Sequence, residues 1–201
     1  MTKEPVTVAP SVSLRNAYAL MRSRKIRRLP VVEADRLIGI VTLTDMTKLL
    51  FVGEGGTNAT AIDNCTVREF MTEKPETAGP NDPIEKAALL MYRRGVSSLP
   101  IVDDGKLVGI ITETDIFKAF ITIMGIDEEG TRIVLELKSE DTGFQEIMDC
   151  VEEHGVDLLS IATLHTYSRT HTLAVIRVKG FETDSFTEDI RDSGFRVLEI
   201  S

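Results

Sequence analysis

Gly39-Ile40-Val41-Thr42-Leu43-Thr44-Asp45 recurs seventy positions later as Gly109-Ile110-Ile111-Thr112-Glu113-Thr114-Asp115, and this repeated stretch decides the fold. The sequence around it repeats as well, because Met1 to Leu50 aligns without a gap on Met71 to Phe120. A Leu-Pro pair precedes the stretch by the same distance in both copies. A duplication of this length predicts two copies of one supersecondary unit with the same local structure.

Apolar spacing within one copy predicts the order β-α-β-β-α. Leu14, Ala17, Tyr18 and Met21 recur at helical spacing. Two short apolar runs follow, at residues 29–32 and 37–42, and their lack of alternation predicts strands that are buried on both faces. A second short helix is expected to start near residue 44.

The second copy adds signals for the two ends of its first helix. Asp82 is the expected N-cap, with Pro83 at the first helical position, and Gly95 is the expected stop. Neither copy has enough apolar surface to bury its strands alone. We therefore expect the copies to pack face to face as a pseudo-two-fold pair.

Composition divides the chain further. We expect the first repeat at residues 1–52, a loop at 53–65, the second repeat at 66–125 and an acidic linker at 126–130. In residues 131–201, alternation at 133–137 is followed by a helical stripe, two strand patterns, a second helix pattern and a last strand pattern. The stripe is formed by Phe144, Ile147, Met148 and Val151. This order, βαββαβ, is the ferredoxin-like arrangement, so the whole chain is predicted to be α/β (α+β).

Charge and hydropathy exclude several classes of protein. The chain is 42% hydrophobic and 27% charged, which predicts a globular protein with a core. Residues 126–201 hold 7 Lys/Arg against 17 Asp/Glu, a net charge of −10, and residues 1–125 are nearly neutral, so neither part predicts nucleic-acid binding. The longest apolar stretch is too short to cross a membrane. Two distant cysteines and a start unlike a signal peptide favour the cytoplasm.

The Thr-x-x-Asp ends of the two repeated stretches support two interpretations. Thr42 with Asp45, and Thr112 with Asp115, fit capping boxes that satisfy the first N–H groups of a helix. A helix N-terminus also attracts phosphate, and a carboxylate beside it can accept hydrogen bonds from both ribose hydroxyls. The glycine that begins each stretch would allow a close approach of backbone.

The spacing from Leu-Pro through Gly-Ile-(Val/Ile)-Thr to Asp strongly resembles the cystathionine-β-synthase (CBS) domain, and the pair resembles a Bateman module that binds adenosine derivatives. The resemblance implies that Asp45 and Asp115 hold a ribose and that Thr42 and Thr112 contact phosphate or ribose. It implies that the segment before Leu-Pro faces the phosphates. It also implies that the early Thr-x-x-Pro piece lines the nucleoside pocket. These two segments point to further residues, namely Arg27, Arg28, Ser98, Thr7 and Thr77.

The copies differ in charge where a phosphate would bind. Arg27 and Arg28 in the first copy stand where the second copy has Ser97 and Ser98. Cations near a helix C-terminus also have a purely structural explanation. Arginine matches phosphate geometry, so we hypothesise that the pocket containing the two arginines prefers more phosphates than its twin. We expect Arg28 and Asp45 to serve one ligand.

Residues 138–144 resemble the turn after the first strand of ACT domains, which are amino-acid-sensing modules that often form dimers. The resemblance implies an amino-acid site at Asp141, Thr142, Gly143 and Phe144, although Thr142 replaces the usual proline. A dimerisation role alone is the alternative. His165 and His171 flank a turn and could bind zinc, but no third ligand is evident and a solvated hairpin is the default.

The CBS, CBS, ACT order resembles the acetoin-utilisation protein family. It implies a non-enzymatic, homodimeric sensor of AMP, ADP, ATP or S-adenosylmethionine that needs no cofactor. The alternative is an interaction module with vestigial clefts. Nothing in the sequence supports a third possibility, an enzyme: there is no nucleophile elbow, and the cysteines lack basic neighbours.

Overall fold

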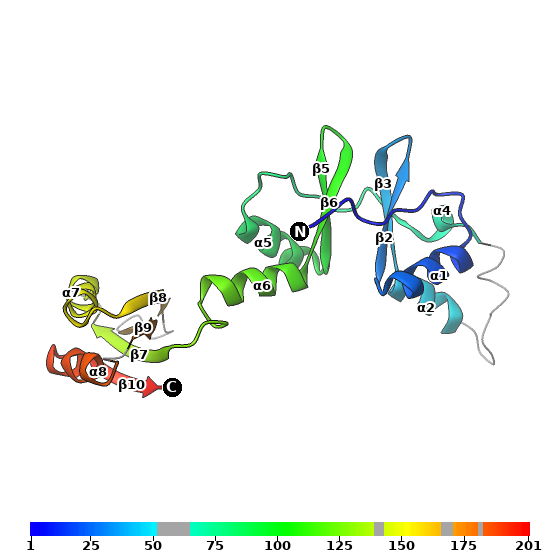
Figure 1. Ribbon diagram of the computed structural model, residues 1–201. Coiled ribbons are helices and arrows are strands. Elements are labelled where there is room, and N and C mark those ends of the chain that lie inside the picture. Colours follow the sequence, from blue (N-terminus) through cyan, green and yellow to red (C-terminus); the bar gives the residue numbers. More distant parts are fainter. Residues whose placement is uncertain (52–64, 139–142, 166–170, 181–182) are drawn as a thin grey trace. The chain divides into compact units, whose positions relative to one another are not determined.

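The computed structural model describes residues 1–51, 65–138, 143–165, 171–180 and 183–201. The chain forms two compact units, an N-terminal unit (Met1–Ile116) and a C-terminal unit (Phe117–Ser201), which are shown in Figure 1. Among the described residues, no helix is long and apolar enough to cross a membrane.

The first copy has the predicted order of elements. Its elements are β1 (Thr2–Lys3), α1 (Leu14–Arg24), β2 (Arg28–Glu33), β3 (Arg36–Thr42) and α2 (Leu43–Phe51). Helix α1 begins at an N-cap serine, whose hydroxyl accepts from the Asn16 N–H. Its buried face contains Leu14, Ala17 and Met21, as the periodicity predicts. These side chains pack on the hairpin β2–β3, where Leu29 and Val41 are fully buried.

The second copy repeats this order seventy residues later. Its elements are β4 (Thr72–Glu73), α5 (Ile84–Arg94), β5 (Ser98–Asp103), β6 (Lys106–Thr112) and α6 (Glu113–Ile123). Gly95 ends α5 in the left-handed conformation, at a φ of 64°, as predicted. The predicted N-cap is wrong, because Pro83 occupies that position. The Asp82 carboxylate instead accepts from the Gly79 N–H and from Lys86.

The two copies are joined by exchanged strands. Strand β1 of the first copy pairs with β6 of the second, and β4 of the second pairs with β3 of the first. One six-stranded sheet results, in which the hairpins β2–β3 and β5–β6 stand side by side (Figure 1). The two exchanges have equivalent registers, as the predicted pseudo-two-fold pair requires, and each copy keeps a core of its own.

Gly39 and Gly109 make this exchange possible. An added Cβ at Gly39 would lie 2.6 Å from Met71 Sδ and 3.0 Å from the Thr72 carbonyl oxygen. At Gly109 it would lie 3.1 Å from the Thr2 carbonyl oxygen. The backbone that approaches each glycine thus belongs to the other copy. The absence of a side chain at Gly39 and Gly109 makes room for this backbone and not for a ligand.

The lead into the second copy packs on the first copy. Helix α4 (Val67–Phe70) begins with a capping box formed by Thr66 and Glu69. Val67 is fully buried in the core of the first copy, and its N–H donates to the Val12 carbonyl at 2.8 Å. The expected start of the second repeat at residue 66 is thus structurally part of the first copy. The expected loop at 53–65 lies almost wholly outside the described residues.

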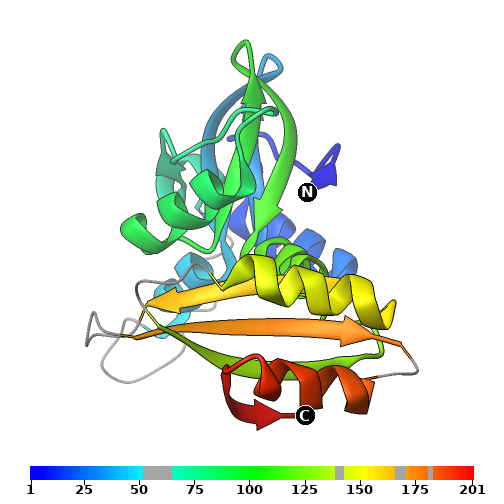
Figure 2. The same cartoon turned by 90° about the vertical axis from the view of Figure 1, so that its left-hand side faces the viewer.

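The C-terminal unit has the predicted βαββαβ order. Its elements are β7 (Thr131–Lys138), α7 (Phe144–His154), β8 (Asp157–His165), β9 (His171–Lys179), α8 (Thr183–Asp192) and β10 (Arg196–Ile200). The sheet is antiparallel in the order β10-β7-β9-β8, the ferredoxin-like arrangement. Both helices cover one face of the sheet (Figure 2) and enclose a core that includes Phe186, Leu135 and Ile176.

The predicted helical stripe of this unit is partly wrong. Ile147 and Val151 are buried in α7, but Phe144 is 40% exposed and Met148 is 43% exposed. Cys150 takes the third buried position. The buried face of the helix is therefore rotated toward positions 147, 150 and 151.

Candidate functional site

Two clefts of nearly equal size lie in the N-terminal unit. The first, named here the Thr42 cleft, has a volume of about 430 Å³ and is lined by Ile40, Thr42, Asp45, Thr72, Lys74, Pro75, Glu76, Arg94, Gly95, Val96, Ser97 and Ser98. The second, the Thr112 cleft, has a volume of about 440 Å³ and is lined by Thr2, Glu4, Pro5, Val6, Lys25, Ile26, Arg27, Arg28, Pro30, Ile110, Thr112 and Thr114. Shifting the first set by seventy residues reproduces most of the second. The duplication in the sequence is therefore a duplication of the site.

Each cleft is built from both copies. In the Thr42 cleft the end of β3 comes from the first copy, whereas residues 72–76 and 94–98 come from the second. In the Thr112 cleft these origins are reversed. The exchanged strands explain the arrangement, because β4 and β1 carry each lead segment onto the other copy.

The capping interpretation of Thr-x-x-Asp is confirmed in both copies. Asp45 Oδ2 accepts from the Thr42 N–H at 3.0 Å and from Thr42 Oγ1 at 2.7 Å. Asp115 Oδ2 makes the same two bonds with Thr112, at 2.9 and 2.7 Å. Each cap uses one carboxylate oxygen, and the described part of the chain gives Asp45 Oδ1 no hydrogen bond. Capping and ligand binding are therefore compatible at this carboxylate.

Asp115 differs from Asp45 in its surroundings. Its Oδ1 lies 3.5 Å from the ammonium group of Met1, and its side chain is absent from the lining of the Thr112 cleft. Burial alone would raise the pKa of the Asp115 carboxyl, but the hydrogen bonds from Thr112 and the nearby ammonium outweigh burial and hold this pKa below its ordinary value. Asp115 is thus an anion at neutral pH.

Arg27 and Arg28 line the Thr112 cleft, so the expectation that Arg28 shares a ligand with Asp45 is wrong. The reason is the strand exchange, which places the pre-strand segment of each copy in the other copy's cleft. Arg28 Nη1 donates to the Ser97 carbonyl oxygen at 2.5 Å and so links the two copies. Burial lowers the pKa of Arg28, and Glu113 counteracts part of this effect.

Two of the predicted lining residues lie outside both clefts. Thr7 and Thr77 are exposed and absent from the linings, whereas their preceding neighbours Val6 and Glu76 are present. The segment was predicted correctly, but the lining ends one residue earlier, at Val6 and Glu76. Ser98 does line the Thr42 cleft, as expected.

Sequence reasoning missed several charged lining residues. Lys74 and Glu4 occupy equivalent positions in the two clefts and both have positive φ, 48° and 49°. Arg94 Nε lies 3.0 Å from Glu76 Oε1. Lys25 occupies the position of Gly95. Most of these residues lie seventy positions from a lining residue of the other cleft, and the rest lie within a lining segment. The repeat could therefore have identified them from the sequence.

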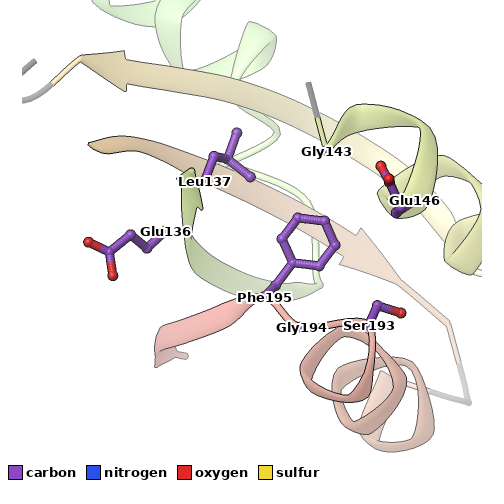
Figure 3. Close-up of a pocket in the computed structure, with 7 residues that line it drawn as sticks. All are labelled: Glu136, Leu137, Gly143, Glu146, Ser193, Gly194 and Phe195. Carbon is purple, nitrogen blue, oxygen red and sulfur yellow. The ribbon is translucent and has the colours of Figure 1, made fainter. Parts of the chain in front are cut away.

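A smaller cavity lies in the C-terminal unit at the start of α7. Its volume is about 170 Å³, and its lining includes Gly143, Glu146 and Phe195. Figure 3 shows the Phe195 ring directed toward Leu137 and Gly143, while Glu136 points away from the ring. Of the predicted amino-acid site, Gly143 lines this cavity and Phe144 begins the helix. Asp141 and Thr142 lie outside the described residues.

The described ranges hold no cluster of three metal-ligating side chains. The strands that His165 ends and His171 begins, β8 and β9, pair as the predicted hairpin. The side chains of the two histidines lie outside the described residues, so their exposure to solvent stays a prediction. The third histidine, His154, has a structural environment: Nε2 lies 3.0 Å from Asp189 Oδ2 and the ring meets Phe186 edge to face. These contacts fasten α7 to α8.

Comparison with curated proteins finds relatives of the N-terminal unit. Protein MJ1225 of Methanocaldococcus jannaschii is 35% identical over 126 residues, which is 60% of this chain and 45% of the relative. Homoserine O-acetyltransferase of Methanohalobium evestigatum is 33% identical over 118 residues, which is 58% of this chain and 22% of the relative. The chain thus spans less than half the length of these curated relatives.

Solved structures also match part of the chain. A Vibrio cholerae protein described as an acetoin utilization protein (AcuB) aligns with a TM-score of 0.54 and 27% identity, over 64% of this chain and 91% of that one. The structure of CBSX2 in complex with AMP aligns with a TM-score of 0.53 and 27% identity, over 60% of this chain and 90% of that one. The family model of the CBS domain matches residues 1–52 and 67–122, more than half of the sequence. The chain therefore belongs to the CBS-domain family and carries two CBS domains.

Proposed function

We propose that the protein is a regulatory sensor that binds an adenine nucleotide in the clefts between its two CBS domains. The observation that carries this proposal is the Thr-x-x-Asp geometry, in which Asp45 keeps one carboxylate oxygen available beside a helix N-terminus. The structural similarity to CBSX2, whose structure was determined with AMP, supports the choice of ligand. CBS-domain proteins are generally regulatory.

The chemistry of the clefts suits each part of a nucleotide. Asp45 Oδ1 is positioned to accept from ribose hydroxyls, and the first N–H groups of α2 and α6 favour phosphate. Apolar side chains suited to an adenine ring occur in both linings, Ile40, Pro75 and Val96 in one and Ile110, Pro5 and Ile26 in the other. Volumes of about 430 and 440 Å³ lie in the range of small-molecule sites. AMP, ADP, ATP and S-adenosylmethionine are the candidate ligands.

Thermal unfolding with each candidate ligand tests the proposal. A ligand present at 100 times its Kd adds about 2.7 kcal/mol of stability, which corresponds to about 5–10 °C for a chain of this length. The control is the double variant Asp45→Asn, Asp115→Asn. Asparagine still offers a carbonyl oxygen to Thr42 or Thr112, so the caps persist, but the available Oδ1 of the Asp45 carboxylate and the negative charge of Asp115 are gone. The proposal fails if none of the four ligands raises the Tm of the natural chain.

We propose that the response to nucleotide is binding without turnover. After incubation with ATP, chromatography should recover the nucleotide intact. Release of phosphate or pyrophosphate at a rate that follows protein concentration would instead support an enzyme.

For the C-terminal unit we propose an ACT-like role in homodimer formation, with amino-acid binding as a second role. Leu164 on the edge strand β8 and Leu198 on the edge strand β10 are 56% and 46% exposed. Exposed apolar side chains on open sheet edges favour pairing with another chain. The cavity beside Gly143 contains the Glu146 carboxylate, which suits the ammonium group of an amino acid.

Sedimentation velocity at several concentrations tests the homodimer, and Leu198→Lys should shift the population toward monomer. Monomer at every concentration would leave the interaction role without support. Titration with a panel of the twenty amino acids by calorimetry tests the cavity. The matched variant is Glu146→Gln, which should abolish any heat of binding while leaving the oligomeric state unchanged.

A further inference from the structure

The two clefts differ in charge although their backbones repeat. Glu4, Lys25, Arg27 and Arg28 line the Thr112 cleft, three cations against one anion. Asp45, Lys74, Glu76 and Arg94 line the Thr42 cleft, two cations against two anions. Asp115, which lies near the Thr112 cleft, still leaves the cations in excess there.

The cations of the Thr42 cleft are further compensated. Arg94 is paired with Glu76 at 3.0 Å, within the lining itself. The equivalent of Glu76 in the other cleft is Val6, which brings no charge. The positions of Arg27 and Arg28 are taken by Ser97 and Ser98, which offer hydroxyl groups without charge. The cations of the Thr112 cleft are thus Lys25, Arg27 and Arg28, which all lie in the pre-strand segment.

Lys25 supports the same distinction. It ends α1 in the left-handed conformation, at a φ of 54°, where its counterpart Gly95 has a φ of 64°. A residue with a Cβ carries an energetic cost in this region that glycine avoids. The lysine side chain is therefore kept at the edge of the Thr112 cleft in spite of an unfavourable backbone conformation.

Arg28 can reach a ligand without leaving a buried group unpaired. Its present acceptor, the Ser97 carbonyl oxygen, also accepts from the Glu113 N–H at 3.2 Å. If the guanidinium turned to a phosphate, that carbonyl would keep one donor. Arginine can bind phosphate through two parallel N–H groups, which a serine at this position cannot do.

We infer that the clefts take different ligands: a nucleoside di- or triphosphate in the Thr112 cleft, and a nucleoside with at most one phosphate in the Thr42 cleft. Arg28, with Arg27 and Lys25 beside it, is the residue that sets the difference. The inference rests on the proposed function, because it assumes that both clefts accept adenosine compounds.

Calorimetric titration of full-length variants separates the two clefts. Asp45→Asn disables the Thr42 cleft. Asp115→Asn disables the Thr112 cleft, because a ribose bound there would replace the Met1 ammonium at Asp115 Oδ1. Each variant retains its helix cap. In the Asp45→Asn chain, ATP should bind more tightly than AMP. Adding Arg28→Ser should weaken ATP about 10- to 100-fold, the loss typical of hydrogen bonds to a charged group. It should weaken AMP less than about threefold. In the Asp115→Asn chain, ATP should have no advantage over AMP.

Two further variants keep the test decisive if Arg28→Ser impairs folding. Arg24→Ser removes a cation from the last turn of α1 that lines neither cleft, and it should leave the ATP-to-AMP ratio unchanged. Ser97→Arg, made in the Asp115→Asn chain, should give the Thr42 cleft a preference for ATP.

The outcomes distinguish the two claims. If the natural chain binds no adenine nucleotide, the proposed function fails and this inference fails with it. If AMP and ATP bind but the Thr112 cleft shows no preference, or if the preference appears in the Thr42 cleft, the inference alone is overturned.

Discussion

Replacing Gly39 by alanine should loosen the junction between the two CBS domains. The new Cβ would lie 2.6 Å from Met71 Sδ and 3.0 Å from the carbonyl oxygen of Thr72. The methionine can move, since its side chain is flexible. The Thr72 carbonyl cannot move independently, because β4 is paired with β3 through Gly39–Glu73 and Ile40–Thr72. The strand must therefore shift away from β3.

The expected cost follows from the size of this overlap. Inserting a methyl group into a packed contact typically costs about 1–3 kcal/mol. For a chain of this length each kcal/mol lowers Tm by about 2–4 °C, so the expected loss is about 2–12 °C. Gly109→Ala should have a smaller effect, because its closest contacts are both at 3.1 Å.

Differential scanning calorimetry and nucleotide titration measure the two consequences. Beyond stability, Gly39→Ala should weaken ligand binding in the Thr42 cleft more than in the Thr112 cleft, because β4 continues into Lys74–Glu76 of that lining. Gly79→Ala is the matched control, since its new Cβ would meet only ordinary contacts at 3.6 Å and beyond. A Gly39→Ala chain that melts within about 1 °C of the natural chain and binds nucleotide equally well would refute this account of the junction.

Thr112→Val should cost about 0.5–2 kcal/mol through loss of the helix cap. Because the folded-state pKa of Asp115 lies below its unfolded value, this contribution is present above the unfolded pKa and is lost as pH falls through the folded pKa. Urea unfolding at neutral and acidic pH should show the difference between variant and natural chain shrinking, and a constant difference would contradict the role of Asp115. Phe186→Ala should destabilise the C-terminal unit by about 3–5 kcal/mol, since this side chain is fully buried there. Calorimetry should show one transition lowered while nucleotide affinity stays unchanged, and a parallel loss of affinity would show that the units do not unfold separately. Arg68→Ala breaks the exposed ion pair with Glu33 and should change stability by less than about 1 kcal/mol in the same assay, where a larger loss would assign Arg68 a structural role.

The repeat made the elements of the N-terminal unit predictable. Helical spacing from Leu14 to Met21 and the two apolar runs correspond to α1, β2 and β3. Partner choice was not predictable in the same way. Strands β1 and β4 are two residues long and exposed, so they carry no apolar pattern. The only sign of their pairing in the sequence is the glycine at positions 39 and 109, which leaves room for the paired strand.

Because the pairing of strands between the two copies was not predicted, the site was predicted only in part. The Thr-x-x-Asp geometry is local, since donor and acceptor are three residues apart, and it followed from the motif. The assignment of Arg28 to the Thr112 cleft depends on contacts across 69 residues, such as its bond to Ser97. The prediction of Thr7 and Thr77 failed for a smaller reason, because the lining of each cleft ends one residue before them.

In the C-terminal unit the order of elements was predicted, but the orientation of α7 was not. Phe144 and Met148 fit a helical stripe as well as Cys150 does, and their spacing alone does not say which set faces the sheet. The structure buries Cys150, whose sulfur lies 3.9 Å from Ser193 Oγ.

The exchanged strands make the two CBS domains mutually dependent. Loss of the lead segment of the first copy would remove part of the Thr112 cleft, which lies at the end of β6 in the second copy. Loss of the lead segment of the second copy would remove part of the Thr42 cleft, at the end of β3 in the first copy. A bound nucleotide would contact both domains at once and would stabilise their association, so the two domains would be held together more strongly when the clefts are occupied.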